Sequence, residues 1–263
     1  MQTLFLRLEG PLQAWGLRAR WGERDTADAP TKSGVIGLLG CALGLRRDDA
    51  RLRDLSDQVR MGVRVDLPGT LLRDYHTTGG GRFSDAPATS KSRFHDEPYI
   101  GGVLSAEVNN QGRIKVKINA NTGEPETDVS TRFYLADASF RVALQGPDTL
   151  IDELARAVQH PVWPLFLGRK ACVPATPVYD GAGQFDDLEV ALAERTFSRR
   201  VLQAWERGRP NALRALIETV AGQGNRQYDN IGVPGCRVFR PRYVREVWLP
   251  LDADSGSINT LEG

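Results

Sequence analysis

Hydrophobic and polar positions alternate along the first residues of the chain, which predicts that it begins with a β-strand. Leucine occupies every second position between residues 3 and 9, which is the period of a half-buried strand. The dipeptide Gly10-Pro11 ends this pattern, and a connection rich in Gly, Arg and Trp then runs to residue 32. This connection is too long for a simple turn, and long ordered loops usually carry function.

The next pattern has helical spacing. Residues 33–43 place apolar side chains along one stripe, and residues 48–59 form a second amphipathic stretch; both patterns predict helices. Three glycines, Gly34, Gly37 and Gly40, repeat every third residue in the first of these helices. Because a glycine inside a helix costs about 1 kcal/mol relative to alanine, the repeat predicts close approach by a strand, a neighbouring chain or a ligand backbone. Ordinary side-chain packing is the alternative.

The middle of the chain carries an insertion of different character. Strands are expected over residues 61–65 and 70–76, after which residues 77–131 become rich in Gly, Ser, Thr, Asn and charged residues. Within this insertion, residues 100–108 and 113–119 are typical of a β-hairpin joined by a polar turn. The insertion is therefore expected to form a structure of its own.

The order of the remaining elements predicts the fold class. Residues 133–144 alternate again and residues 147–158 have helical spacing, so without the insertion the order is strand, helix, strand, strand, helix. One further strand would complete the split βαβ, or ferredoxin-like, plan. We therefore expect an α+β fold with a ferredoxin-like palm of the RRM type over residues 1–180. A fold by itself is a weak guide to function.

The last third of the chain is less regular. A helix is expected from residue 188 to 205, residues 207–235 look rich in loops, and residues 236–249 are typical of one or two strands that carry four arginines. We expect residues 181–263 to form a smaller β-rich region packed on the palm.

Composition and charge exclude several classes of protein. Lys and Arg number 34 and Asp and Glu number 33, for a formal net charge of +1, so any nucleic-acid site must be local. No signal-peptide pattern opens the chain and no run of about 18 apolar residues occurs, which favours a cytoplasmic protein without membrane contact. The three cysteines are far apart and the three histidines lack metal-binding spacing. We expect reduced thiols, no metal and no cofactor.

The segment around Lys32 and Ser33 is a candidate phosphate site. It superficially resembles a nucleotide-binding P-loop, but that motif needs glycine six residues before the lysine, where this chain has Thr26. A helix N-terminus with a hydroxyl and an ammonium group can nevertheless hold one phosphate. Simple capping by Thr31 or Ser33 is the alternative.

Two further loops carry groups suited to RNA. Gln13 could recognise a base edge and Trp15 could stack on a splayed base, although a tryptophan that fills the core is the alternative. Arg169 and Lys170 follow Gly168 in a glycine turn that suits a phosphate backbone.

An acid–base site has less support. Asp74, Tyr75 and His76 are adjacent, and such groups serve metal-independent ribonucleases. Neighbours in a strand point to opposite faces, however, which separates Tyr75 from the other two. Arg113, Lys115 and Lys117 share one face of the expected hairpin, which predicts either a solvated face or one that follows phosphates.

Five ordered motifs resemble the CasD family, the type I-E branch of the fifth family of CRISPR-associated proteins. They are LxLEGPLQAWG at 6–16, APTKSGVIGLLGCALG at 29–44, RDYHTT at 73–78, RFYLADASFRVAL at 132–144 and PLFLGRKACVPATP at 164–177. The resemblance covers residues 1 to about 180 and is loose beyond them. It implies a ferredoxin-like palm on which residues 77–131 form a protruding thumb.

The resemblance also implies a function. Members of this family hold the 5′ handle of CRISPR RNA, cap one end of the Cascade backbone filament and contact the large subunit, so they meet target DNA only through the complex. On this basis the expected RNA-binding residues are Gln13, Trp15, Arg20, Lys32, Ser33, Tyr75, His76, Arg93, Arg113, Lys115, Arg169 and Lys170.

Two other functions stay open. A sister branch of the family cleaves precursor CRISPR RNA without metal. Its cleavage site resembles a set of Tyr, Lys and His, and no adjacent Lys-His pair occurs here. A protein-only scaffold, whose arginines meet acidic partners, is the third interpretation. We expect no enzymatic activity.

Overall fold

The chain forms two compact units in the computed structural model, which describes residues 1–17, 22–79, 82–83, 99–100, 106–108, 114–116, 127–231 and 239–251. Unit 1 comprises Met1–Arg18, Asp25–Leu72 and Phe133–Gly263, and unit 2 comprises Ala19–Arg24 and Arg73–Arg132. The second unit thus contains the insertion of distinct composition together with a short piece of the long N-terminal connection.

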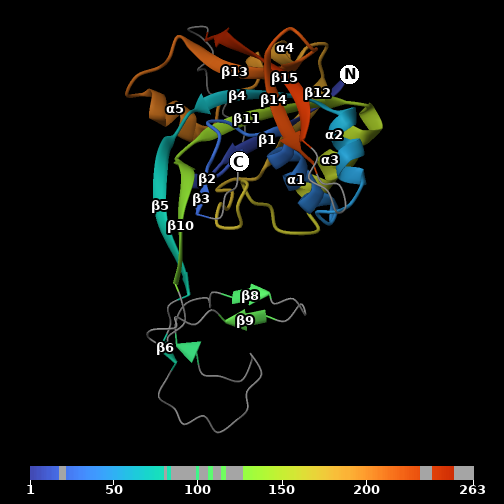
Figure 1. Cartoon of the computed structure of the whole chain (residues 1–263). Coiled ribbons are helices and arrows are strands. Elements are labelled where there is room, and N and C mark those ends of the chain that lie inside the picture. The colour runs from blue at the N-terminus through green and yellow to red at the C-terminus, as the bar shows by residue number, and fades with distance from the viewer. Residues whose placement is uncertain are drawn as a thin grey trace. The chain divides into compact units, whose positions relative to one another are not determined.

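A seven-stranded sheet forms the centre of unit 1 (Figure 1). Its order is β12-β1-β11-β4-β13-β15-β14, and each neighbouring pair is antiparallel. The strands are β1 (Gln2–Glu9), β4 (Arg60–Leu67), β11 (Ser139–Gly146), β12 (Tyr179–Gln184), β13 (Ala212–Thr219), β14 (Asn225–Asn230) and β15 (Phe239–Pro250). The C-terminal strands therefore extend the sheet that the N-terminal strands begin.

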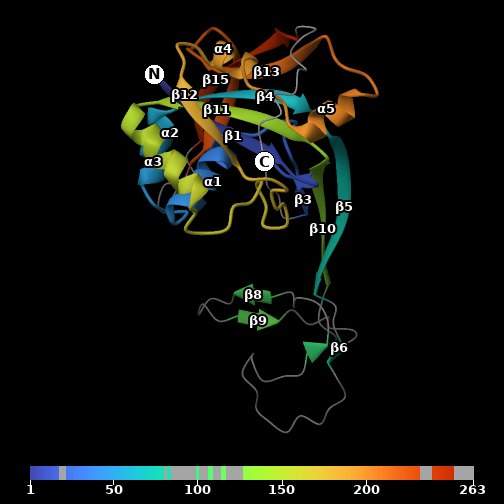
Figure 2. The same cartoon turned by 180° about the vertical axis from the view of Figure 1, so that it is seen from behind.

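Helices cover both faces of this sheet, as the view from behind also shows (Figure 2). Helices α1 (Lys32–Leu43), α2 (Arg51–Gln58) and α3 (Asp148–Gln159) pack on the face that carries Leu4. Helix α4 (Leu188–Ala193) packs on the face that carries Phe5, and α5 (Arg199–Trp205) packs against β13. Strand β1 is therefore buried on both faces, whereas its alternating pattern predicted a half-buried strand.

Helix α1 explains the glycine repeat by side-chain packing. Thr31 caps the helix, because its side chain accepts a hydrogen bond from the Gly34 amide. A Cβ at Gly34 would lie 2.8 Å from the Trp15 ring, and a Cβ at Gly40 would lie 2.7 Å from Leu52, but a Cβ at Gly37 would meet nothing. Tight contacts with side chains of the same unit therefore account for two of the three glycines.

The shorter strands belong to smaller sheets. In unit 1, β2 (Leu12–Gln13) pairs with the last residues of β10 (Thr127–Ala136). In unit 2, β3 (Glu23–Arg24) runs parallel to β10 at Thr131, and β5 (Thr70–Gly79) also pairs with β10. Two antiparallel pairs join β6 (Arg82–Phe83) to β7 (Tyr99–Ile100), and β8 (Ala106–Val108) to β9 (Ile114–Val116). The β8–β9 pair falls where the sequence predicted a hairpin, over shorter spans.

Two predictions for the C-terminal third are wrong. The single helix expected over residues 188–205 is two helices, because the chain leaves α4 after Ala193 and Ser198 caps a new helix by accepting from the Val201 amide. The region expected to be rich in loops contains β13 and β14. Along β13 the buried residues Leu213, Ala215 and Ile217 alternate with less buried ones, which include Arg214 and Glu218.

Candidate functional site

Three motifs that are far apart in the sequence meet at the first turn of α1. The Ala14 amide donates to the Leu167 carbonyl at 3.1 Å, and the ring of Trp15 lies against Gly34. Gly168 has φ +93°, and a Cβ there would lie 1.8 Å from the Ala14 carbonyl oxygen, so only glycine fits this turn. The loops expected to bind RNA in unit 1 therefore form one structure.

Gln13 and Trp15 build the interior of this structure. Gln13 is fully buried, and its Nε2 donates to the carbonyl oxygens of Leu8 and Ala138 at 2.9 Å. Its Oε1 accepts from the indole Nε1 of Trp15 at 3.1 Å, and Trp15 is 1% exposed. In this conformation neither residue presents a free edge or ring face. Trp15 fills the core, which is the alternative to base stacking that the sequence left open.

Lys32 is part of a buried ion pair. It is 5% exposed, and its Nζ donates to the Val59 carbonyl at 2.8 Å and to Glu218 Oε1 at 2.8 Å. The positive charge expected to meet a phosphate is thus already compensated inside the protein. Glu218 lies on β13, in a region expected to be a loop, which is why the sequence did not reveal this partner. Ser33 beside it is half-buried.

The loop at residues 168–170 divides two roles between its cations. The guanidinium group of Arg169 donates to the carbonyls of Phe133 and Asp25 at 3.0 Å and stacks 4.7 Å from the Tyr134 ring centre. Lys170 is exposed. Arg169 therefore fixes the loop, and Lys170 presents its ammonium group to the solvent.

The remaining expected residues belong to unit 2. Tyr75 on β5 is 68% exposed, and His76 Nδ1 lies 3.6 Å from Asp74 Oδ2. Asp74 and His76 are thus close to each other, as the alternation of side chains along a strand predicts for residues two apart. Arg20, Arg93 and Arg113 lie outside the described residues, and Lys115 is described only by its register in β9, opposite Glu107.

A cluster of buried arginines was not foreseen. Arg7, Arg141 and Arg64 stand side by side in register across β1, β11 and β4. Arg7, Arg141 and Arg195 all form ion pairs with Asp180, whose side chain is 4% exposed. Burial by itself would raise the pKa of Asp180, but the attraction of Arg141, Arg7 and Arg195 outweighs it and lowers this pKa. The available signal was one arginine of this cluster within each of three strands rich in apolar residues: Arg7 in β1, Arg64 in β4 and Arg141 in β11.

The same cluster explains why the chain breaks between α4 and α5. Arg64 donates to the carbonyls of Leu192 and Arg195, the latter at 2.9 Å, and Arg141 donates to the Thr196 carbonyl at 2.9 Å. A continuous helix would engage these carbonyls in its own hydrogen bonds. The buried guanidinium groups therefore stabilise the non-helical segment.

The histidines, cysteines and carboxylates of the described residues bear on metal and redox chemistry. No cluster of three or more His, Cys, Asp or Glu side chains that could hold a metal ion occurs among those residues. Cys41 and Cys172 are free, and burial raises the pKa of both thiols, which makes them poor nucleophiles. In the same part of the chain, no helix is long and apolar enough to cross a bilayer.

Comparisons with known proteins agree with the motifs. Residues 3–245 match the family model described as CRISPR-associated protein (Cas_Cas5). The Cascade subunit CasD of Escherichia coli (strain K12) is 37% identical over 201 residues, which cover 72% of this chain and 75% of CasD.

Two solved structures are similar over nearly the whole chain. One, described as the crystal structure of a Cas protein, is 32% identical with a TM-score of 0.60 and covers 94% of this chain and 95% of its own. Another, from a CRISPR RNA-guided surveillance complex, is 29% identical with a TM-score of 0.66 and covers 95% and 91%. The resemblance to CasD is confirmed, and the chain belongs to the Cas5 family of CRISPR-associated proteins.

Proposed function

We propose that this chain is a non-catalytic subunit of a type I-E CRISPR surveillance complex and that it holds the 5′ handle of the CRISPR RNA. The similarity to CasD, which is a Cascade subunit, supports the assignment to that complex. The observation that carries the RNA-binding role is the convergence of three shared motifs on one loop structure, with exposed Lys170 beside it. Its partners would be the RNA, the backbone subunits and the large subunit, with target DNA met only through the complex.

We also propose that part of unit 1 is a ferredoxin-like palm. The four strands β12-β1-β11-β4 stand in the order 4-1-3-2 of that plan when counted along the chain. Helices α1 and α2 connect its first two strands and α3 connects its last two, all on one face. Unit 2, which is inserted between the middle two strands, would be the thumb.

The RNA contacts fall into two groups within this proposal. In unit 1, Lys170 would meet a phosphate directly, while Arg169 and Ser33 shape the surface beside it. In unit 2, exposed Tyr75 offers a ring for stacking and His76 a hydrogen-bonding edge. The basic residues Arg20, Arg93, Arg113 and Lys115 complete the expected set.

Retention of guide RNA by the purified chain tests the proposal. Wild type should retain a labelled RNA that carries the 5′ handle and leave it intact with or without divalent metal. Lys170→Ala should reduce the slope of log Kobs against log salt by about 0.7, because one phosphate contact on a single strand is lost. Arg207→Ala removes an equally exposed cation elsewhere in unit 1 and should leave the slope unchanged.

Site-specific cleavage of the RNA would contradict this proposal. If that cleavage also disappeared in His76→Ala, the chain would instead be the metal-independent endoribonuclease that processes precursor RNA. Assembly of the complex without any RNA retention by this subunit would favour the protein-only scaffold.

A further inference from the structure

A cleft of about 380 Å³ lies in unit 1 between α2, the start of α1 and the β14–β15 pair. Its volume is in the range of about 300–1,000 Å³ that is usual for ligand sites. Five of its lining residues are cationic and three are acidic, which leaves a surplus of two positive charges. None of the motifs that predicted RNA binding, except Lys32, reaches it.

The floor of the cleft consists of two buried ion pairs. Lys32 is held by Glu218 and the Val59 carbonyl, as described above. Arg242, which is 9% exposed, donates through Nε to Asp229 Oδ2 at 2.6 Å, and Asp229 is 6% exposed. Since both carboxylates are engaged by buried cations, the floor is rigid and electrically balanced. Its charge is not available to a ligand.

The rim of the cleft carries the surplus charge. Arg240 pairs with Asp57 at 3.0 Å in an exposed contact, and Arg60 donates only to the backbone carbonyl of Glu218 at 3.3 Å. Arg53 is half-buried, and within the described part of the chain its guanidinium group makes no hydrogen bond or ion pair. Among the described residues, therefore, no carboxylate pairs with either of these two arginines of the cleft. The planar guanidinium fork matches the oxygens of a phosphate.

The position of the cleft favours RNA as the source of that phosphate. Lys32 and Gly34 are two residues apart on α1, so at 3.6 residues per turn they point about 200° apart, to nearly opposite sides of the helix. Gly34 contacts Trp15, beside the loop that carries Lys170, whereas Lys32 lines the cleft. The two sites therefore flank one helix end, and a helix with its side chains is only about 10–12 Å wide. A single RNA strand a few nucleotides long spans that width.

We propose that this cleft is a second phosphate-binding site for the RNA, with Arg53 and Arg60 as its ligands. The proposal rests on the RNA-binding function proposed above. It adds residues outside the motifs of the family resemblance, and it predicts that the bound strand passes over the N-terminal end of α1. Acidic side chains of a partner protein are the competing occupant.

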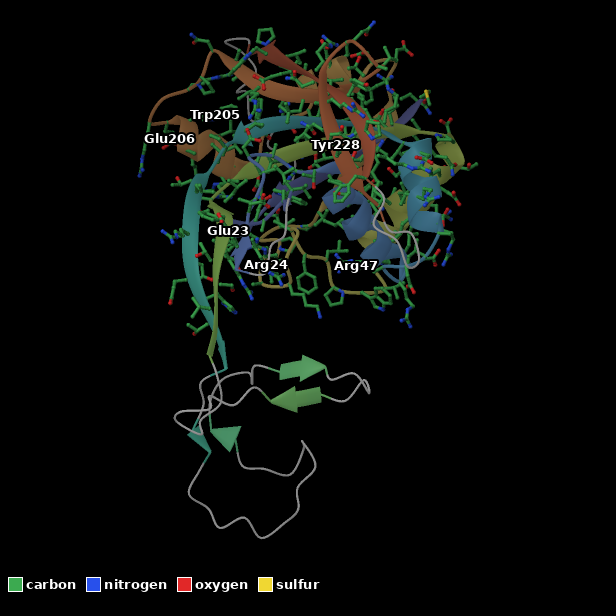
Figure 3. The ribbon with its side chains drawn as sticks, viewed as in Figure 1. Glu23, Arg24, Arg47, Trp205, Glu206 and Tyr228 are labelled. Carbon is green, nitrogen blue, oxygen red and sulfur yellow. The ribbon has the colours of Figure 1, made fainter. Side chains whose placement is uncertain are left out.

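The test compares two double variants of the full chain. Arg53→Ala with Arg60→Ala removes the proposed ligands. Arg46→Ala with Arg47→Ala removes the same charge from the loop after α1, where both side chains are exposed and Figure 3 labels Arg47. Retention of labelled guide RNA is measured over a series of KCl concentrations, and incorporation into the assembled complex is measured in parallel. The urea midpoint of each variant checks its folding, and Arg53→Ala alone serves if the double variant is unstable.

Loss of the cleft arginines should lower RNA affinity about tenfold or more and reduce the salt slope by about 1.4, as expected for two phosphates on a single strand. The control should match wild type. An unchanged slope in a folded cleft variant would overturn the inference while leaving the proposed function intact, and failed assembly with unchanged RNA affinity would assign the cleft to an acidic protein. If wild type itself retained no RNA, the proposed function would fail first and the cleft proposal with it.

Discussion

Replacement of Asp180 by asparagine should destabilise unit 1 strongly. Asp180→Asn keeps the shape of the side chain but leaves Arg141, which is 1% exposed, without its negative partner, and it also weakens the contacts of Arg7 and Arg195. Removal of one member of a buried ion pair costs about 3–5 kcal/mol. With a urea dependence of about 3 kcal/mol per molar for a unit of this size, the midpoint should fall by about 1–1.7 M. Fluorescence of Trp15 and Trp205, both buried in unit 1, reports the transition.

The pH dependence of this difference follows from the lowered pKa of Asp180. Burial opposes ionisation but the three arginines prevail, so the folded pKa lies below the ordinary value of about 3.9. A carboxyl group of this kind contributes its full stability above the unfolded pKa and loses it as the pH falls through the folded pKa. The gap between wild type and Asp180→Asn should therefore stay constant from pH 7 to about pH 5 and narrow below about pH 4. Asp137→Asn, at an exposed pair with Arg200, should cost less than about 1 kcal/mol. A similarly small cost for Asp180→Asn would show that the buried ion pairs of Asp180 do not stabilise unit 1.

Three further changes test single contacts by urea unfolding. Thr31→Ala removes the cap of α1 at Gly34 and should cost about 1 kcal/mol, with Thr31→Ser as the control that retains it. Gly168→Ala should cost more than about 2 kcal/mol and weaken RNA retention, because a Cβ there would clash with a backbone carbonyl; full stability would show that the turn is not needed. Lys32→Ala strands the Glu218 carboxylate and should cost about 3 kcal/mol, whereas the charge-free pair made by adding Glu218→Gln should recover part of the loss.

Local periodicity predicted most of the strands and helices of unit 1 before residue 180 and fewer of those in the C-terminal third. Leucine alternation, the helical stripe of residues 33–43 and the helix at 147–158 depend on neighbours within a few residues, and the structure has β1, α1 and α3 there. The break between α4 and α5 depends on Arg64 and Arg141, which lie 55 to 131 residues away in the sequence. No local pattern contains that information.

The candidate site was predictable by position but not by the role of each residue. The motifs around residues 13–15, 32–33 and 168–170 do meet in unit 1. The sequence could not show that the side-chain amide of Gln13 donates to the carbonyls of Leu8 and Ala138, because the sheet brings these partners together and spacing along the chain does not. A polar side chain in a motif can serve the ligand or the loop that holds it, and only the three-dimensional partners distinguish the two.

Partners in the folded structure also determine which cations of a nearly neutral chain can bind a polyanion. Arg64, Arg141, Lys32 and Arg242 are each buried and bound to a carboxylate, so their charges stabilise the fold and give little field outside it. With a formal net charge of +1, attraction for RNA must come from cations that lack such partners. Among the described residues of unit 1, Lys170 at the loop and the two rim arginines of the cleft are cations of this kind that also lie at a proposed RNA site. Binding in this chain should therefore depend steeply on a few surface cations, and removal of the buried ones should unfold unit 1 before it changes the salt slope.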